Sequence, residues 1–286
     1  MGLDLTVYAI PAFVGLMLAE GAAVARHGLR GYERRDTVAS LAMGLGNVVI
    51  DLAMKGVHFA LLATVAQWAP WHLTPSWITW AVLLVAADLV YYWFHRLHHE
   101  VRVLWAAHEN HHSSQRYNLS TALRQSWTTP FTIMLFWWPL ALLGFPPAMI
   151  LAAIALNTLY QFWIHTEVVD RIGWLEGVLN TASHHRVHHA ANLEYLDRNH
   201  GGMFIVWDKL FGTFEPERAP VRYGLTTNVD SFNPLAIASH EWRAIGRDLR
   251  RARTWRARLG YLFGPPGWSP DGAPHTSRAL REAAAA

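Results

Sequence analysis

The fold of this chain is decided by residues 77–99, WITWAVLLVAADLVYYWFHRLHH. An apolar run of about 20 residues is long enough to cross the core of a bilayer as a helix. This run leads directly into His95, His98 and His99, whose i, i+3 and i+4 spacing places them on one helical face. Because neutral imidazole is a common ligand for iron, zinc and copper, the stretch predicts a membrane helix with metal ligands at its end.

Two further histidine clusters repeat this spacing. They are His108-Glu-Asn-His111-His112 and His184-His185-Arg-Val-His188-His189, with His165 between them. So many imidazoles exceed the needs of one metal ion, whereas two ions about 3.5–4 Å apart would use them. The spacing alone does not exclude His98, and His184 could reach the site from one turn before His188. Individual members could instead be buried or surface histidines with hydrogen-bonding roles.

The composition is that of a membrane protein without cysteine chemistry. Of the 286 residues, 52% are hydrophobic and only 16% are charged, and the 15 Trp and 9 Tyr suit the two interfaces of a bilayer. The absence of cysteine excludes disulfides and thiolate metal sites. The net charge of +3 is small and no nucleic-acid-binding motif is present, so the basic residues indicate a membrane surface rather than a nucleic acid partner.

Five apolar segments are expected to form membrane-embedded helices. They cover residues 5–24, 38–68, 77–94, 128–145 and 147–164, with the fourth broken by Pro139. The second contains Asp51, Lys55 and His58, and charges within a span usually face a protein interior. We therefore expect an all-α fold: an integral membrane helical bundle of about four to five membrane-embedded helices, with a cytosolic histidine-rich helical cap that holds a di-metal site.

The arginines that follow the first span orient this bundle. Arg26, Arg30, Arg34 and Arg35 lie in or beside the next loop, which the positive-inside rule assigns to the cytoplasm. Counting the crossings from there places all the histidine clusters on the cytoplasmic face. The Ala- and Arg-rich composition is typical of a bacterial inner membrane protein, and the endoplasmic reticulum membrane is the eukaryotic equivalent.

Three parts are expected within one structural unit: N-terminal membrane helices at 1–75, a histidine-rich catalytic part at 76–235 and a C-terminal part at 236–286. In the last part, arginines alternate with apolar residues over 240–262, which predicts a basic amphipathic helix. This helix could lie on an anionic membrane surface or pack against its own protein. The tail from Ser269 is expected to be loosely ordered.

Asp88 is a candidate catalytic residue because it shares a helical stripe with Tyr92, His95 and His99. A carboxylate near a ligand commonly fixes the orientation of the imidazole. Asp88 could instead pair with Lys55 or with an arginine.

Gln161 lies four residues before His165, on the same helical face. It could be a weak ligand, bind a metal-bound water or be a structural amide. All-nitrogen ligation in apolar surroundings favours iron and O₂, because apolar walls would hold a lipid tail beside an activated oxygen. Hydrolytic zinc normally needs fewer histidines and often a carboxylate base.

Longer motifs surround the histidines. They are DLVYYWFHR at 88–96, LWAAHENHHSS at 104–114, YNLSTALRQS at 117–126, YQFWIHTE at 160–167, NTASHHRVHH at 180–189 and WDKLFGTF at 207–214. Together they resemble the fatty acid hydroxylase and sterol desaturase superfamily of membrane di-iron enzymes. Within it, the chain is most similar to the alkylglycerol (glyceryl-ether) monooxygenases.

The resemblance implies nine metal ligands, namely His95, His99, His108, His111, His112, His165, His185, His188 and His189. The first family motif is H-x-x-x-H, which leaves His98 out. Some relatives have a histidine where this chain has Gln161, and the family often has tyrosine where this chain has His200. The subgroup-specific segment 117–126 is expected to line the site or the substrate entrance, unless Arg124 packs or pairs structurally.

The resemblance also implies a reaction, in which two iron ions use O₂ to hydroxylate a lipid C–H bond next to an ether oxygen. An electron donor, a pterin or a redox protein, would complete it, and tetrahydrobiopterin is the reductant of the animal enzyme. A sterol desaturase or fatty acid hydroxylase would use the same chemistry. Two other classes remain, a membrane metal transporter or store and a non-catalytic lipid-binding scaffold. Clusters at span ends argue against a pore, and the complete histidine signature argues against a scaffold.

Overall fold

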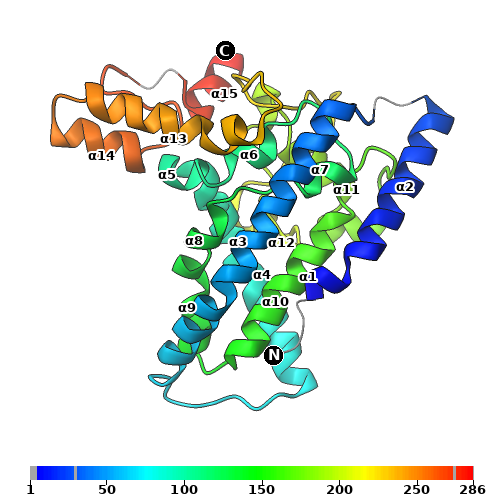
Figure 1. The fold of residues 1–286 in the computed structure, drawn as a ribbon, viewed down its shortest axis with the longest axis vertical. Helices are drawn as coiled ribbons and strands as arrows, with labels where there is room; N and C mark the ends of the chain where they lie inside the picture. The colour runs from blue at the N-terminus through cyan, green and yellow to red at the C-terminus, as the bar shows by residue number, and fades with distance from the viewer. Residues whose placement is uncertain (1–4, 29–30, 273–274, 286) are drawn as a thin grey trace.

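The computed structural model describes residues 5–28, 31–272 and 275–285 (Figure 1). The elements in chain order are α1 Leu5–Tyr8, α2 Ile10–His27, α3 Arg34–Ala66, α4 Trp77–Glu100, α5 Arg102–Trp105, α6 Glu109–His112, α7 Leu119–Ala122, α8 Thr129–Thr132, α9 Met134–Leu142, α10 Pro147–Phe162, the 3₁₀ helix η1 Gly173–Gly177, α11 Ala182–His188, the 3₁₀ helix η2 Leu193–Tyr195, α12 Val206–Phe211, α13 Pro234–Arg251, α14 Trp255–Phe263 and α15 Ser277–Ala285. The described residues contain isolated bridge pairs but no sheet, so the all-α expectation is confirmed for them.

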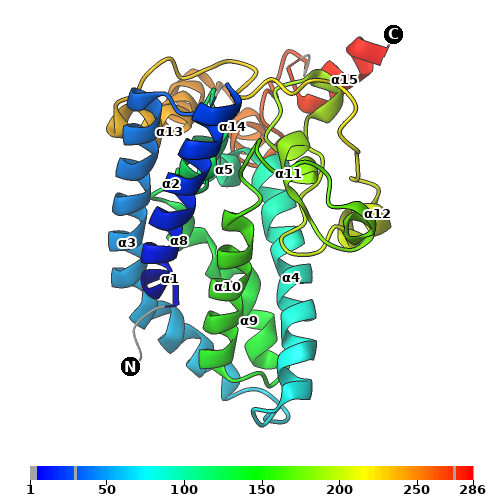
Figure 2. The same cartoon turned by 90° about the vertical axis from the view of Figure 1, so that its right-hand side faces the viewer.

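Helices α3, α4, α9 and α10 stand side by side as the bundle (Figures 1 and 2). α4 begins where the Ser76 side chain accepts a hydrogen bond from the Thr79 backbone N–H at 3.1 Å. α10 begins with Pro147 in its first turn, where a missing N–H is tolerated. Local capping chemistry therefore sets where the long helices start.

Apolar side chains fill the space between these four helices. Leu62 of α3, Leu83 of α4, Trp137 of α9 and Ile150 of α10 are nearly inaccessible and belong to one cluster. Many other apolar side chains of α2, α3 and α4 point outward. Helices α3 and α4 are long and apolar enough to cross a membrane by length and composition, whereas 129–142 and 147–162 are shorter apolar helices. An apolar outer surface of this extent is what a lipid environment covers.

The charges within the second apolar segment have local partners. Lys55 lies 3.6 Å from Asp51, and both side chains are about one-third exposed rather than turned into the protein. His58 is buried, and its Nε2 donates to the Pro130 carbonyl at 2.8 Å.

The break in the fourth apolar segment is not at Pro139, as the sequence suggested. Pro139 lies inside α9, and the interruption falls near Ile133, between α8 and α9. There the Thr132 hydroxyl donates to the Thr129 carbonyl at 3.0 Å, and the Thr129 hydroxyl donates to Ala107 at 2.6 Å. Side-chain hydrogen bonds of this kind compete with a regular helix.

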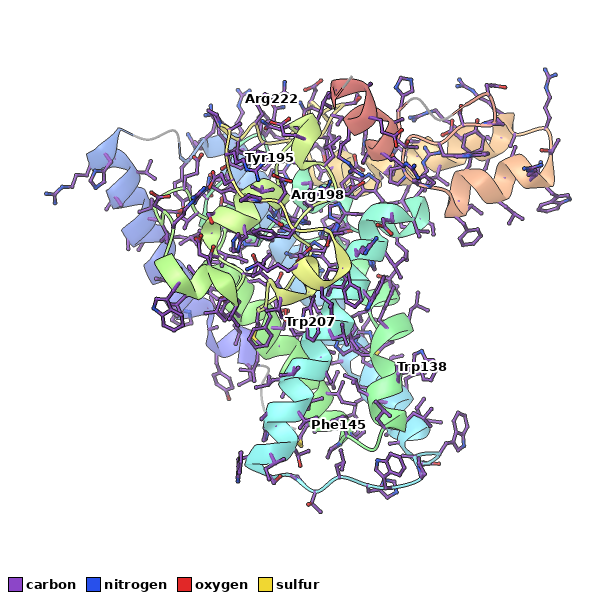
Figure 3. All side chains as sticks on the ribbon, turned by 180° about the vertical axis from the view of Figure 1, so that it is seen from behind. Trp138, Phe145, Tyr195, Arg198, Trp207 and Arg222 are labelled. Atoms are coloured by element: carbon purple, nitrogen blue, oxygen red, sulfur yellow. The ribbon has the colours of Figure 1, made fainter. Side chains whose placement is uncertain are left out.

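The short helices form a cap at one end of the bundle. Figure 3 shows Tyr195, Arg198 and Arg222 in this cap and Trp138 and Phe145 toward the opposite end. The loop between α3 and α4 lies at that opposite end, as does the turn between α9 and α10 (Figure 1). Both α4 and α10 therefore run toward the cap.

The C-terminal part differs from expectation in two respects. The arginine-rich segment of 240–262 falls in two helices, α13 and α14, rather than one. The tail is not loosely ordered throughout, because Ser277–Ala285 form α15. Arg281 fixes this helix by donating to the Leu196 carbonyl at 2.6 Å. Residues 273–274 and 286 of the tail lie outside the described residues.

Candidate metal centre

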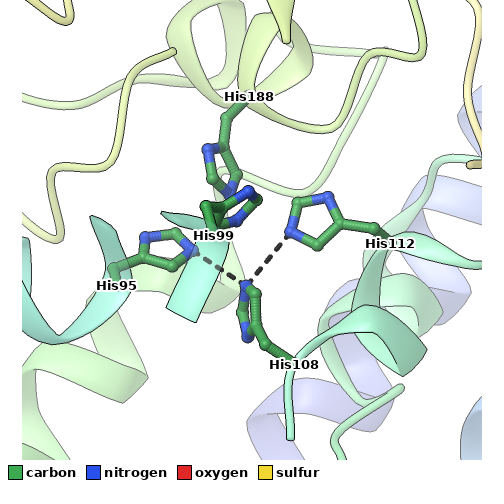
Figure 4. A group of neighbouring side chains, drawn as sticks. All are labelled: His95, His99, His108, His112 and His188. Atoms are coloured by element: carbon green, nitrogen blue, oxygen red, sulfur yellow. Dashed lines mark hydrogen bonds between the residues drawn. The ribbon is translucent and has the colours of Figure 1, made fainter. Parts of the chain in front are cut away.

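Five buried histidines form a first group at the cap end of the bundle (Figure 4). They are His95, His99, His108, His112 and His188, and their possible ligand atoms lie within 4.8 Å of one another. His95 and His99 stand one turn apart near the end of α4, so the helix aims both rings at one point. His108 precedes α6, His112 ends it, and His188 reaches the group from α11.

A second group lies beside the first. It contains His111, His165, His185 and His189, again with ligand atoms within 4.8 Å. Because α6 and the α11 segment contribute to both groups, the groups adjoin, and the His112 and His189 rings stack at 4.3 Å. The structure thus brings the nine histidines singled out in the sequence into two neighbouring clusters.

Backbone carbonyls fix the proton position on three of these rings. The Nδ1 atoms of His95, His165 and His188 donate to the carbonyl oxygens of His200 at 2.9 Å, Gln161 at 2.7 Å and Arg198 at 2.9 Å. A carbonyl can only accept, so Nδ1 carries the single proton of the neutral ring. The Nε2 atom of each ring is left with a free lone pair, as in a metal ligand.

The Nε2 atoms face one another at close range. The separations are 3.0 Å for His95–His108, 3.1 Å for His108–His112, 3.1 Å for His111–His165, 3.0 Å for His165–His185 and 3.2 Å for His185–His189. Two nitrogens bound at right angles, each about 2.1 Å from an ion, would be about 3.0 Å apart. Among the described residues, the buried Nε2 atoms of His99 and His188 have no hydrogen-bond partner, a costly arrangement unless they have a ligand. The donor set therefore fits metal ions.

Burial keeps these imidazoles neutral. Desolvation, reinforced by the neighbouring imidazoles, holds the pKa of His108, His112, His188 and His189 well below the ordinary value. Burial lowers the pKa of His165 to about 4. At neutral pH each ring is therefore in the unprotonated form that binds a metal.

Two histidines of the motifs lie outside both groups. Both ring nitrogens of His98 have other partners, since Nδ1 donates to the Phe94 carbonyl at 2.7 Å and Nε2 lies 3.0 Å from the Thr132 hydroxyl. The ring of His184 packs against Phe214. The structure therefore separates both residues from the clusters.

Asp88 has partners other than the expected ligand imidazole. Its carboxylate accepts hydrogen bonds from Met203 N at 2.6 Å, Phe204 N at 3.1 Å, the Trp207 indole at 2.9 Å and the Asn157 amide at 2.6 Å. A Cβ added to Gly202 would lie 2.7 Å from Asp88, so only glycine allows this approach. These bonds hold the loop that contains His200. The His200 carbonyl accepts a hydrogen bond from Nδ1 of His95. Asp88 reaches the imidazole through a loop and not by contact.

The carboxylate beside a histidine of the first group is Asp197, which sequence reasoning missed. Its Oδ1 lies 3.5 Å from Nδ1 of His99. Asp197 has a φ of 53°, a left-handed conformation that Asp adopts more readily than most residues. Arg281 of α15 lies 3.8 Å from its other oxygen. No local pattern links Asp197 to His99, because a loop far along the chain brings it there.

The Gln161 side chain forms hydrogen bonds away from the histidine nitrogens. It accepts from the Tyr91 hydroxyl at 2.7 Å and donates to Asn157 Oδ1 at 2.5 Å. Its backbone carbonyl, rather than its amide, holds His165.

Arg124 lies in a buried ion pair, the structural alternative to a site-lining role. Its guanidinium is 3.1 Å from Asp36 of α3 and donates to Ser113 Oγ at 3.0 Å. It therefore ties α3 to the end of α6. In the same segment, the Tyr117 ring lies 5.2 Å from the ring of His189, so Tyr117 does line the second group.

His200 is a further residue beside the first group whose position sequence reasoning missed. It is fully buried, and its ring lies 5.1 Å from His99 and 5.6 Å from His188. Neither of its ring nitrogens has a hydrogen-bond partner in the part of the chain that the structure describes. Its position after Asn199, where tyrosine is usual, was the available signal.

Comparisons with known proteins agree with this architecture. The fatty acid hydroxylase family matches residues 80–213. The alkylglycerol monooxygenase of Xenopus tropicalis is 40% identical over 240 residues, covering 82% of this chain and 53% of that protein. The corresponding human protein is 39% identical over 275 residues, covering 93% of this chain and 60% of that protein. The chain thus spans a little over half the length of these relatives.

A bacterial relative is matched over more of its own length. Ornithine lipid hydroxylase OlsE of Rhizobium tropici is 33% identical over 235 residues, which cover 78% of this chain and 70% of that protein. No solved structure matches the chain. With the family motifs, the identity and the coverage in agreement, the chain belongs to the fatty acid hydroxylase family.

Proposed function

We propose that this chain is a membrane-bound di-iron oxygenase that uses O₂ to hydroxylate a C–H bond of a lipid. The observation that carries the proposal is the pair of adjacent all-histidine groups, buried where an apolar helical bundle meets its cap. Relatives named for the oxidation of alkylglycerols and of ornithine lipids support a lipid substrate.

The favoured substrate is an alkylglycerol-type ether lipid, oxidised at the carbon next to the ether oxygen. Hydroxylation there gives a hemiacetal, which breaks down to an aldehyde and a glycerol derivative. The electron donor would be a tetrahydropterin or a redox protein. A second candidate is hydroxylation of a bacterial lipid such as an ornithine lipid, favoured by the match to ornithine lipid hydroxylase over 70% of its length. A fatty acid hydroxylase would use the same chemistry. A sterol desaturase would use the same centre.

In this proposal, separate sets of residues bind the metal ions, orient the ligand rings and exclude water. The nine clustered histidines would hold two iron ions, which supply O₂ activation when bound. The carbonyls of His200, Gln161 and Arg198 keep three rings in the ligating tautomer. The apolar side chains next to the histidine groups would exclude water and receive a lipid tail. They include Phe94 and Trp137, whose ring centres lie 5.1 Å apart.

The placement in the cell follows from the same reasoning. Two long apolar helices and the named relatives support a membrane location. We assign the centre to the cytoplasmic face, in a bacterial inner membrane or its eukaryotic equivalent in the endoplasmic reticulum. Residues 76–235 would form the catalytic domain, between the membrane helices of 1–75 and the C-terminal part of 236–286.

A substrate panel tests the proposal. Purified protein in nanodiscs is given ¹⁸O₂, a tetrahydropterin and either an alkylglycerol, an ornithine lipid or a sterol. Release of fatty aldehyde from the alkylglycerol is expected, with ¹⁸O retained when the aldehyde is reduced to the alcohol as it forms, before its oxygen exchanges with water. Labelled hydroxyl on the ornithine lipid alone would favour the second candidate, and products that form equally without O₂, or no product at all, would refute oxygenation.

A further inference from the structure

Helix α14, Trp255–Phe263, carries an apolar stripe that is exposed. Trp255, Leu259 and Phe263 recur every four residues and have relative exposures of 75%, 53% and 60%. This spacing places the three side chains on one side of the helix. Ala257, on the other side, is buried. A soluble surface rarely concentrates large apolar groups on so short a helix.

Arginines border the stripe on both sides. Arg256 and Arg258 are exposed, and the Arg258 guanidinium lies 5.1 Å from the centre of the Trp255 ring. Arg253 and Arg251, also exposed, precede the helix. Apolar residues flanked by arginine are typical of a helix that lies in the interface of an anionic membrane.

The position of α14 relative to the bundle is fixed at the exit of α4. The backbone N–H of Arg102, just beyond the end of α4, donates to the Gly264 carbonyl at 3.0 Å. The Arg102 side chain pairs with Glu241 at 2.6 Å and with Asp248 at 2.7 Å, both on α13. Since α4 is apolar and long enough to cross a membrane, these bonds hold α14 at the level where that span ends.

Helix α13 has a different role, although it too is rich in arginine. Its apolar Ile237 and Ile245 are buried, and Ile237 packs with Ala39 and Met43 of α3. Figure 1 shows α13 and α14 extending sideways from the cap, with α14 on the side of α13 that faces the bundle's far end. α13 therefore packs on the protein, and α14 lies outside it with its apolar stripe exposed.

We propose that α14 lies in the headgroup region of the bilayer that the bundle spans, with its apolar stripe at the acyl boundary and its arginines on anionic lipid headgroups. Burial of Trp255, Leu259 and Phe263 in lipid removes their apolar surface from water. Arg256 and Arg258 add attraction to anionic lipids. The contact anchors the cap to the membrane surface, whatever lipid the centre oxidises.

The chain has no cysteine, so one introduced thiol can carry a single spin label. Leu259→Cys is labelled in the full chain and placed in nanodiscs of equal parts phosphatidylcholine and phosphatidylglycerol. Arg243→Cys, an exposed position on α13, is the matched control. Collision rates with O₂, which partitions into lipid, and with a water-soluble nickel chelate report the depth of each label. The label at 259 is expected to favour O₂ and the label at 243 to favour nickel; equal access of nickel to both would overturn the proposal.

A second arm tests the arginines. Adding Arg256→Gln and Arg258→Gln to the labelled Leu259→Cys chain is expected to lower its O₂-to-nickel ratio at least about twofold, because each arginine near an anionic surface adds to the attraction. An unchanged ratio would contradict the assigned role of these arginines. Shielding of the 259 label from both reagents, or spin–spin broadening, would show that protein covers the stripe and would also overturn the proposal.

Discussion

Each clustered imidazole has a nitrogen directed into the centre, and several have a fixed partner behind them. Carbonyls hold His95, His165 and His188, and Asp197 lies behind His99. These partners determine which nitrogen is free to bind a metal. The contribution of a histidine therefore depends on its partners as much as on its motif.

The contrast between His112 and His98 follows from this geometry. His112→Ala removes a ring from the first group and is expected to abolish activity and lower bound iron. His98→Ala removes a ring that forms hydrogen bonds with Phe94 and Thr132, and is expected to retain most of both. Iron analysis of the two purified variants checks the prediction. Equal loss of iron in both would show that His98 is a ligand.

Asp88 is expected to act as a positioning residue. Asp88→Asn turns one acceptor into a donor facing N–H groups, so it should displace the loop that contains His200. Metal affinity should fall about 10-fold, the lower end of the range for residues bonded directly to a ligand, because Asp88 acts through the loop. Asp51→Asn, at a partly exposed position in another span, is the control. Competition with a chelator measures the affinity, and unchanged affinity in Asp88→Asn would refute the role.

The clustered histidines can be identified from the sequence more easily than the residues that lie behind them in the fold. Residue type and helical spacing indicated the three clusters, because i and i+4 positions share a face, but they did not exclude His98 or decide His184. The family resemblance selected the nine rings that the structure groups together. Asp197 and His200 lie in a loop where Asp197 and Asn199 have positive φ, and no periodicity describes such a path. Their proximity depends on tertiary packing, which a local pattern does not contain.

At the scale of elements, the sequence located the helices but not all their ends. The expected span of 77–94 is the start of α4, which continues to Glu100 and carries three of the histidines. The arginine-rich segment of 240–262 is two helices and not one, because α13 ends at Arg251 and Thr254 caps α14 by accepting from Ala257 N at 3.1 Å. The Thr254 cap sets the start of α14, and hydropathy did not detect it.

The junction of α5, α13 and α14 depends on Arg102. Arg102→Gln leaves Glu241 and Asp248 without their cation and should destabilise the junction by about 3 kcal/mol or less, because Asp248 is partly exposed. Faster hydrogen exchange over residues 234–264 is expected, with iron content maintained. Arg278→Gln, which breaks an exposed pair with Glu282, should change neither. Unaltered exchange in Arg102→Gln would contradict the assigned role.

At the scale of the whole molecule, the sequence predicted the arrangement that matters most. Counting crossings placed every histidine cluster at one end, and α4 and α10 do run toward the same cap (Figure 2). The sideways position of α13 and α14 was not predictable, because it rests on contacts of Arg102 with residues far along the chain.

Burial of so many neutral imidazoles makes the metal-free protein sensitive to acid. The pKa values of His108, His112, His185, His188 and His189 are all lowered on folding. Above about pH 6.5 the rings are neutral in both states and contribute no pH dependence. Below it the unfolded chain binds protons that the folded chain excludes, so stability falls by up to about 1.4 kcal/mol per pH unit for each ring. Thermal unfolding of chelator-treated protein should show a Tm that drops as the pH falls below 6.5; a Tm independent of pH in this range would show that the rings are not buried as neutral groups.

Metal analysis of the detergent-purified chain after anaerobic reconstitution with Fe²⁺ decides whether the two histidine groups hold iron. The two histidine groups predict two iron ions per chain, about 3.5–4 Å apart, and a Mössbauer spectrum of coupled iron after exposure to O₂. The absence of a stoichiometric metal, even after reconstitution, would contradict the account at its centre.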